Sequence, residues 1–145
     1  MRFLIDTDHA SLIQQKTEPE FTALSRRLAA WAETDIVYSI ITVHEQFLGS
    51  HAYINKAQSP RDAASGYERL AKLVDFYKQK CVVSFDEIAA AEFARLKAAR
   101  VRIGPMDLRI ASIALTRGLV LVTRNSRDFR KVPDLEPEDW TVPAR

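Results

Sequence analysis

Four short apolar runs rich in β-branched residues alternate with longer segments in which apolar residues recur at helical spacing. This alternation limits the folds that are open to the chain. The runs cover residues 2–6, 36–40, 81–85 and 119–123. Strands that alternate with helices are typical of α/β proteins. The sequence therefore predicts an α/β domain in which a central, mainly parallel β-sheet is flanked by α-helices.

The segments between the runs carry helical patterns with recognisable ends. We expect a short helix through 11–13, a helix beginning at Thr42, and longer helices over 20–33, 61–79, 88–99 and 107–117. Thr42 and Glu45 fit the Thr-x-x-Glu capping box. Asp86 is expected to cap its helix, Gly118 to end the last one, and Gly49 to permit close helix packing. After the fourth run, Phe129, Val132, Leu135 and Trp140 are expected to pack against the domain.

The length and the cysteine content limit the kind of protein. A chain of 145 residues has the length of one domain, and we expect a single domain over residues 1–145. The N-terminal apolar run reaches Asp6 too soon for a signal peptide, and the uncharged stretch 36–43 is too short to span a bilayer. Cys81 has no partner for an internal disulfide and is expected to be buried. We expect a cytoplasmic protein without a membrane partner.

The positive charges are concentrated in one part of the chain. Residues 95–131 carry ten Lys or Arg residues and two acids, Asp107 and Asp128, which gives a surplus of eight positive charges. The remainder carries eleven Lys or Arg residues against seventeen acids, and the two parts sum to the net charge of +2. Such a stretch is either an ordinary solvated helix face or a surface for a nucleic-acid backbone.

Acidic and amide side chains fall where ligands bind in open α/β sheets, outside the carboxyl ends of the strands. They are Asp6 with Asp8, Glu45, Asp107, and Asn125 with Asp128. If the sheet brings these residues together, three or four carboxylates converge on one cleft at the carboxyl ends of the strands. Unpaired carboxylates repel one another, and a bound divalent cation removes that cost. Oxygen ligands suit Mg²⁺ or Mn²⁺, and the chain offers no Cys/His cluster for zinc.

A divalent cation beside a strongly basic segment is suited to cutting a phosphodiester bond. The cation lowers the pKa of a bound water and neutralises charge on the phosphate. Each acid also has a structural alternative: Asp6 as a helix cap, Glu45 as the capping-box partner of Thr42, and Asp107 as a residue that favours a helix N-terminus.

Several neighbouring polar residues keep open roles. A helix N-cap would explain Asp8 fully. Asp128 is expected to be solvated or paired with Arg124 or Arg127 rather than to be a metal ligand. Thr123 either bonds a carboxylate of the cleft or simply favours a strand. The three histidines, His9, His44 and His51, are expected at the surface or partly packed.

Residues 3–8, 39–49, 103–114 and 121–125 form four motifs in register. Together they resemble the motifs of PIN-domain ribonucleases, in particular the VapC-like toxins of type II toxin–antitoxin systems. Residues 3–8 (FLIDTD) resemble the opening strand and first aspartate of that family, and residues 39–49 (SIITVHEQFLG) its second element. Residues 103–114 (IGPMDLRIASIA) are similar to its third element. Residues 121–125 (LVTRN), with Phe129 and Trp140, are similar to its closing segment. The resemblance spans essentially the whole chain.

The resemblance implies a PIN-like fold and a Mg²⁺- or Mn²⁺-dependent endoribonuclease that cuts structured RNA such as tRNA or rRNA. Asp6, Glu45 and Asp107 match the three core acidic positions, which would make them catalytic residues and metal ligands. Asn125 occupies a fourth position where many relatives have Asp, and would orient a metal-bound water. The family also implies a small VapB-like antitoxin that inhibits the enzyme in a hetero-oligomer, and we expect a homodimer. The helix over 61–79 and the one before it are candidates for the partner surface.

Two other classes of function remain open from the sequence. Residues 4–8 also fit the Asp-x-Asp motif of haloacid-dehalogenase-type phosphatases, although the late paired acids of that family are absent and Glu45 and Asp107 would have no role. A non-catalytic PIN-like module that binds RNA or protein is the other alternative, against which the presence of all three acids argues.

Overall fold

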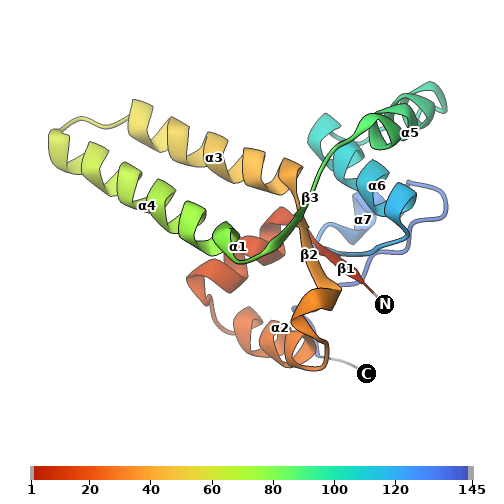
Figure 1. Ribbon diagram of the computed structural model, residues 1–145, viewed down its shortest axis with the longest axis horizontal. Coiled ribbons are helices and arrows are strands. Elements are labelled where there is room, and N and C mark those ends of the chain that lie inside the picture. Colours follow the sequence, from red (N-terminus) through yellow and green to blue (C-terminus); the bar gives the residue numbers. More distant parts are fainter. Residues whose placement is uncertain (1, 144–145) are drawn as a thin grey trace.

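The computed structural model, which describes residues 2–143, contains a four-stranded sheet with the strand order β3-β2-β1-β4 (Figure 1). The strands are β1 (Phe3–Ile5), β2 (Ile36–Ser39), β3 (Cys81–Val83) and β4 (Val120–Val122). Every neighbouring pair is parallel. Each strand lies inside the apolar run that predicted it, so the predicted α/β class with a parallel sheet is confirmed.

Helices connect and cover the strands. They are α1 (Thr7–Gln15), α2 (Glu20–Ala29), the 3₁₀ helix η1 (Glu33–Asp35), α3 (Ile40–Asn55), α4 (Pro60–Lys78), α5 (Glu87–Ala98), α6 (Pro105–Arg117) and α7 (Ser126–Phe129). Asp86 caps α5 as predicted, with its carboxylate accepting from the Ala89 amide at 2.9 Å. Gly118 ends α6 in the left-handed region at φ +62°, a conformation that favours glycine.

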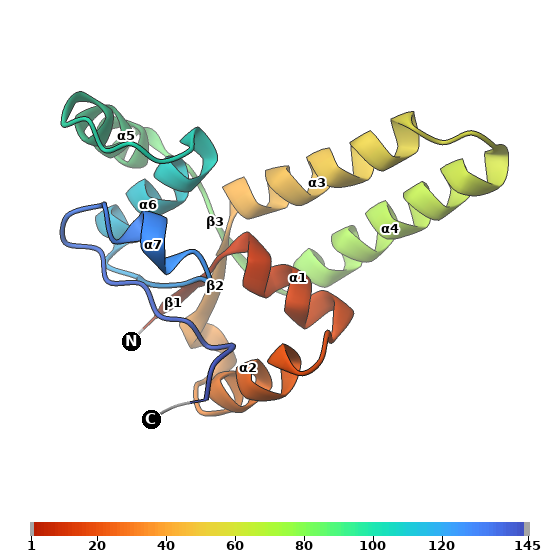
Figure 2. The same cartoon turned by 180° about the vertical axis from the view of Figure 1, so that it is seen from behind.

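The sheet is covered on both faces, which explains why its central strand is apolar at every position. Phe3 and Ile5 point into a core shared with α1, α2 and the C-terminal segment. Leu4 points to the opposite face, into a core shared with α5 and α6. Figures 1 and 2 show these two groups of helices on opposite sides of the strands.

Helices α3 and α4 run side by side and extend away from the sheet as a long hairpin in both views (Figures 1 and 2). Their close approach depends on Gly66, where an added Cβ would lie 2.5 Å from Cγ1 of Ile54. The prediction that Gly49 permits close packing is wrong, because a Cβ at Gly49 would meet no atom within 4 Å.

Two other predictions about the elements need correction, and one short helix was not predicted. Helix α2 ends at Ala29 rather than at residue 33, and η1 follows it. The helix α7 was not predicted, because its four residues are too few to show an apolar periodicity. Cys81 is exposed rather than buried, because it opens β3 at the edge of the sheet.

The C-terminal segment forms a parallel bridge between Glu138 and Val122 of β4 and then packs into the core. The Glu138 amide donates to the Leu121 carbonyl at 2.9 Å, and the Thr123 amide donates to the Glu138 carbonyl at 2.8 Å. Trp140 is completely buried, with its ring 4.8 Å from that of Phe3. This confirms that the segment packs against the domain. We call residues 138–140 the C-terminal strap. Within residues 2–143, no helix is long and apolar enough to cross a membrane.

Candidate active site

The strand order places the carboxyl ends of β1 and β4 side by side where the order of connection reverses. The chain passes from β1 outward through β2 to β3, and then returns to β4 on the other side of β1. Ligands in open α/β sheets bind at such a reversal. The four predicted site residues all come from segments that begin at or near this edge.

Asp6 directly follows β1 and is 5% exposed. Its Oδ1 accepts from the amide of Thr7 at 2.7 Å, and its Oδ2 accepts from the hydroxyl of Thr123 at 2.7 Å. Asp6 is thus the N-cap of α1, which confirms the structural role considered for it from the sequence. It also lies at the edge of the sheet where ligands bind. The bond from Thr123 bears out the carboxylate-bonding role considered for that residue.

Glu45 lies on α3 and is not part of a capping box. The N-cap of α3 is Ser39, whose hydroxyl accepts from the Thr42 amide at 3.1 Å. The prediction that Thr42 caps the helix is wrong because Ser39, the last residue of β2, already ends the extended backbone there. Glu45 Oε1 instead accepts from the hydroxyl of Thr7 at 2.9 Å, which places its carboxylate beside the start of α1.

Asp107 and Asn125 are joined directly. Asp107 lies in the first turn of α6, and its Oδ2 accepts from Nδ2 of Asn125 at 3.2 Å. The same amide nitrogen lies 3.2 Å from Oδ2 of Asp128, so Asn125 bridges two carboxylates. Asp128 also pairs with Lys131 at 3.3 Å rather than with Arg124 or Arg127, the partners considered from the sequence.

Sequence reasoning missed the roles of Asp8 and His9. Asp8 is not an N-cap, because Asp6 takes that position; its Oδ2 accepts from the Arg124 amide at 3.1 Å. His9 is completely buried, which contradicts the expectation of a surface or partly packed histidine. Its spacing to Leu12 and Ile13 on one helix stripe was the signal that indicated burial. Exposed His44 and His51 agree with that expectation.

The electrostatics of the site reflect a surplus of negative charge. Burial, together with the nearby charges of Asp8 and Asp107, raises the pKa of Asp6 to about 7, against the lowering effect of the hydrogen bonds that it accepts. Burial and the charges of Glu45 and Asp128 also raise the pKa of Asp107. Among the described residues, no Lys or Arg forms a salt bridge with Asp6, Glu45 or Asp107.

The donor set suits a hard divalent cation in its chemistry, since every candidate ligand is a carboxylate oxygen and two of the carboxyl groups resist ionisation without a counter-charge. The distances between these side chains fit a single metal ion less well. Across residues 2–143, no three His, Cys, Asp or Glu side chains lie close enough to hold one metal ion. Each core carboxylate is instead turned to a protein donor: Thr7 and Thr123 for Asp6, Thr7 for Glu45, and Asn125 for Asp107.

The basic segment 95–131 is divided between paired and unengaged side chains. Arg95 pairs with Glu92, and Arg117 with Asp86. Arg109 packs over the ring of Phe93 at 5.4 Å. Exposed arginines also lie at positions 124, 127 and 130, on and next to the short helix α7 that follows Asn125. We call these three residues the α7 arginines.

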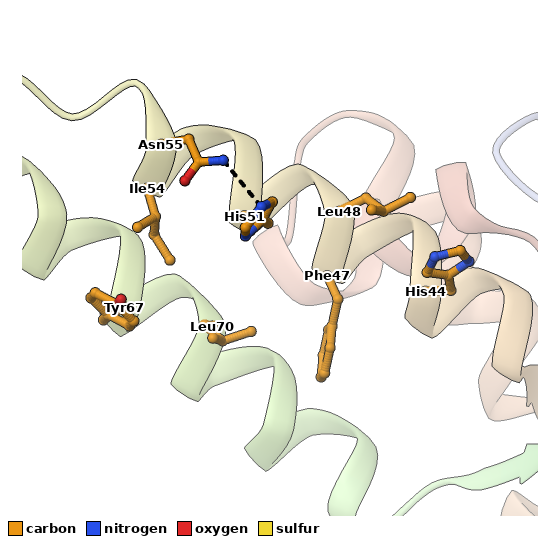
Figure 3. Close-up of a pocket in the computed structure, with 8 residues that line it drawn as sticks. All are labelled: His44, Phe47, Leu48, His51, Ile54, Asn55, Tyr67 and Leu70. Carbon is orange, nitrogen blue, oxygen red and sulfur yellow. Dashed lines mark hydrogen bonds between the residues drawn. The ribbon is translucent and has the colours of Figure 1, made fainter.

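A pocket lies away from the carboxylates, between α3 and α4 (Figure 3). Its volume is about 390 Å³, and it is lined by His44, Phe47, Leu48, His51, Ile54, Asn55, Tyr67 and Leu70. Tyr67 is 60% exposed and Leu48 47%. The hairpin therefore presents apolar side chains to solvent, which is typical of a surface that binds another protein.

The fold and this site define a class of protein. The family model of the PIN domain matches residues 3–135, and the chain belongs to the PIN domain family. The resemblance seen in the sequence is thereby confirmed, and the phosphatase alternative does not fit. That residues 1–145 form one domain stays a prediction.

Within that family, the chain is similar to VapC proteins over nearly its whole length. It is 29% identical to the tRNA(fMet)-specific endonuclease VapC of Shigella flexneri, with 97% of this chain and 99% of that protein covered. It is 30% identical to ribonuclease VapC1 of Haemophilus influenzae at the same coverage of both. Its fold matches a DNA-bound VapBC crystal structure from Salmonella typhimurium with a TM-score of 0.74, 28% identity, and 97% and 98% of the two chains covered.

Proposed function

We propose that the chain is a divalent-metal-dependent endoribonuclease that hydrolyses phosphodiester bonds in structured RNA. The observation that carries the proposal is the convergence of Asp6, Glu45, Asp107 and Asn125 at the β1/β4 edge, coupled through their hydrogen bonds and charges. Similarity to VapC ribonucleases over nearly the whole chain supports it.

Each residue has a distinct part in this proposal. Asp6 and Asp107 would be the main ligands of Mg²⁺ or Mn²⁺, and Glu45 would assist as a ligand or through a water. The bound cation would supply a water of lowered pKa and neutralise charge on the scissile phosphate. Thr7 and Thr123 hold Asp6, and Thr7 also holds Glu45. Asn125 orients Asp107 without adding a charge.

We propose tRNA as the substrate class, with rRNA as the other structured RNA to be tested. The support is the name of the Shigella flexneri relative, a tRNA(fMet)-specific endonuclease. Brief expression of the wild type followed by sequencing of cleaved RNA ends would identify the target, with Asp6→Ala as the inactive control. Purified protein should cleave the same RNA with Mg²⁺ or Mn²⁺ and not in EDTA. Equal cleavage by wild type and Asp6→Ala would refute the assignment, and binding without cleavage would indicate a non-catalytic module.

We propose that a small VapB-like antitoxin binds and inhibits the protein in the cytoplasm, and that the chain is a homodimer within that complex. The apolar α3–α4 surface supports a protein partner, and the matched structure from Salmonella typhimurium is a VapBC complex. A short reading frame beside the gene that encodes a DNA-binding protein would favour this strongly. Co-expression with that protein, with Leu48→Asp and Tyr67→Asp as interface variants, would show whether the complex forms through the hairpin.

A further inference from the structure

A completely buried histidine lies beside the site without a part in the proposed chemistry. Nδ1 of His9 lies 2.7 Å from Oδ1 of Asp8, and Nε2 lies 3.2 Å from the backbone nitrogen of Trp140. A backbone N–H only donates, so Nε2 is the acceptor and carries no proton. The ring proton is therefore on Nδ1, which donates to Asp8. The main chain of the strap thus selects one neutral tautomer of His9.

The other acid near the ring does not compete for it. Oδ1 of Asp139 lies 3.7 Å from Nε2 of His9, beyond hydrogen-bond distance. That oxygen accepts from the amide of Thr141 at 2.8 Å and from its hydroxyl at 2.6 Å. His9 therefore has one donor bond, to Asp8, and one acceptor bond, from the strap.

Both oxygens of Asp8 are occupied by protein donors. Oδ1 accepts from His9, and Oδ2 accepts from the Arg124 amide at 3.1 Å. The Thr123 hydroxyl lies 3.4 Å from Oδ2 of Asp8 but 2.7 Å from Oδ2 of Asp6, and its single proton goes to the nearer carboxylate. Asp8 thereby ties the start of α1 to the loop that follows β4.

That loop holds two of the core acids. Thr123 donates to Asp6, and Asn125 donates to Asp107. The backbone N–H of Asn125 also donates to Oγ1 of Thr123 at 3.0 Å, which links the two contacts. Movement of residues 123–125 would therefore disturb both carboxylates at once.

We propose that His9 is a positioning residue: it locks Asp8 against the loop after β4 and so fixes the orientation of Asp6 and Asp107. Asp8 then acts as a brace between the start of α1 and the loop after β4. This inference rests on the proposed nuclease function for its catalytic consequence, although the brace itself is independent of it.

Two substitutions separate the two bonds of the ring. Asn at position 9 keeps a donor near the place of Nδ1, while Gln keeps an acceptor near the place of Nε2, and His9→Leu removes both. If the bond to Asp8 matters, His9→Gln and His9→Leu should lower kcat on initiator methionine tRNA about 10- to 100-fold, the usual effect of residues that orient ligands. KM should stay unchanged because His9 does not reach solvent. His9→Asn should stay close to wild type, as should the exposed control His51→Gln.

A second readout needs neither RNA nor metal. Hydrogen exchange of the Arg124 amide should be faster in His9→Gln and His9→Leu, and as slow as in wild type in His9→Asn. Asp8→Asn tests the brace itself: its amide has one acceptor oxygen, which cannot serve both His9 Nδ1–H and the Arg124 amide, so exchange should also be faster.

Equal exchange and equal kcat in the Asn and Gln variants would overturn the proposal, as would a purely proportional loss of stability and activity. A wild type that does not cleave any RNA would instead refute the proposed function, while the exchange data would still decide whether the brace exists. If His9→Gln does not fold, the comparison of exchange in His9→Leu and His9→Asn decides the same question.

Discussion

The carboxylate of Asp6 is placed where it destabilises the metal-free protein. It is buried, it has no positively charged partner among the described residues, and its pKa is raised to about 7. A carboxyl group whose pKa is higher in the folded state than in the unfolded state binds protons more tightly in the folded state. Its contribution therefore reduces stability as the pH rises from the unfolded value of about 4, and the loss is complete above the folded value of about 7.

Asp6→Asn is accordingly expected to raise the stability of the metal-free protein at pH 8 more than at pH 5, and to abolish RNA cleavage. The amide cannot ionise, and its oxygen still accepts from Thr7. Since one pKa unit corresponds to about 1.4 kcal/mol, the difference between the two pH values should be about 1 kcal/mol or more. Chemical denaturation in EDTA measures it, with exposed Asp75→Asn on α4 as the control. The same gain at both pH values would contradict the burial argument.

Asn125 offers a second test at the scale of one residue. Asn125→Asp replaces the donor shared by Asp107 and Asp128 with a third negative charge, whereas Asn125→Ala only removes the donor. Without metal, both variants lose the hydrogen bond to half-buried Asp107, which should lower the free energy of unfolding by about 1 kcal/mol. In Asn125→Asp the free energy of unfolding should fall further, because the new carboxylate repels Asp107 and Asp128.

Mn²⁺ should stabilise Asn125→Asp more than Asn125→Ala, because the added carboxylate is a further oxygen ligand for a hard cation. The midpoint of thermal unfolding should rise on adding Mn²⁺ most in Asn125→Asp, less in wild type and least in Asp6→Asn. Equal shifts in Asn125→Asp and Asn125→Ala would mean that position 125 does not face the ion.

At the scale of elements, local signals explain most helix and strand positions. The apolar runs gave the four strands, and Asp86 and Gly118 marked the ends of α5 and α6. The prediction of Thr42 as the cap was wrong because Ser39, another hydroxyl residue three positions earlier, takes that role. The capping-box pattern alone does not show that the backbone is still extended at Ser39 and already helical at Thr42. Gly49 failed for a different reason: close packing of two helices depends on where they cross, which no local pattern records.

The two helical glycines of the α3–α4 hairpin make an element-scale prediction. Gly49→Ala should stabilise the protein by about 0.5–1 kcal/mol, because alanine loses less backbone entropy and meets open space. Gly66→Ala should destabilise the protein, since the new Cβ would displace Ile54 at a cost of about 1–3 kcal/mol. This cost exceeds the gain in backbone entropy that the alanine brings at either position. Urea denaturation of both variants gives the comparison. A gain at Gly66 as large as that at Gly49 would show that the hairpin relaxes freely.

At the scale of the whole molecule, the sheet order decides what the sequence predicts about the site. Asp6, Glu45 and Asn125 were foreseeable because each comes after a parallel strand, and parallel strands bring their carboxyl ends to one edge. Asp107 differs, because it lies in the first turn of the helix that precedes β4. The contact between His9 and Trp140 was not foreseeable, because 131 residues separate the two and only the path of the strap joins them. Pattern therefore identifies the residues at the edge, while the network that holds them depends on the tertiary fold.

The uneven charge of the molecule leads to its own prediction. The α7 arginines are exposed beside the carboxylates, while Arg95 and Arg117 are already paired within the protein. If RNA phosphates lie along the α7 arginines, replacing Arg124, Arg127 and Arg130 with Ala should weaken binding of labelled tRNA. It should also reduce the slope of log Kd against log salt by about 0.7 for each lost phosphate contact, because fewer counterions are released.

A matched triple variant separates a local effect from one of net charge. Ala at Arg61, Lys72 and Lys78 removes the same three positive charges from exposed positions on α4, away from the site. Fluorescence anisotropy in an Asp6→Asn background measures binding without cleavage. The α4 triple should keep the wild-type slope if the RNA backbone lies along the α7 arginines, since salt limits the reach of an exposed charge to about a Debye length (about 8 Å). Equal slopes in the two triples would place the RNA elsewhere or make its attraction a property of total charge, and the α7 arginines would then be an ordinary solvated face.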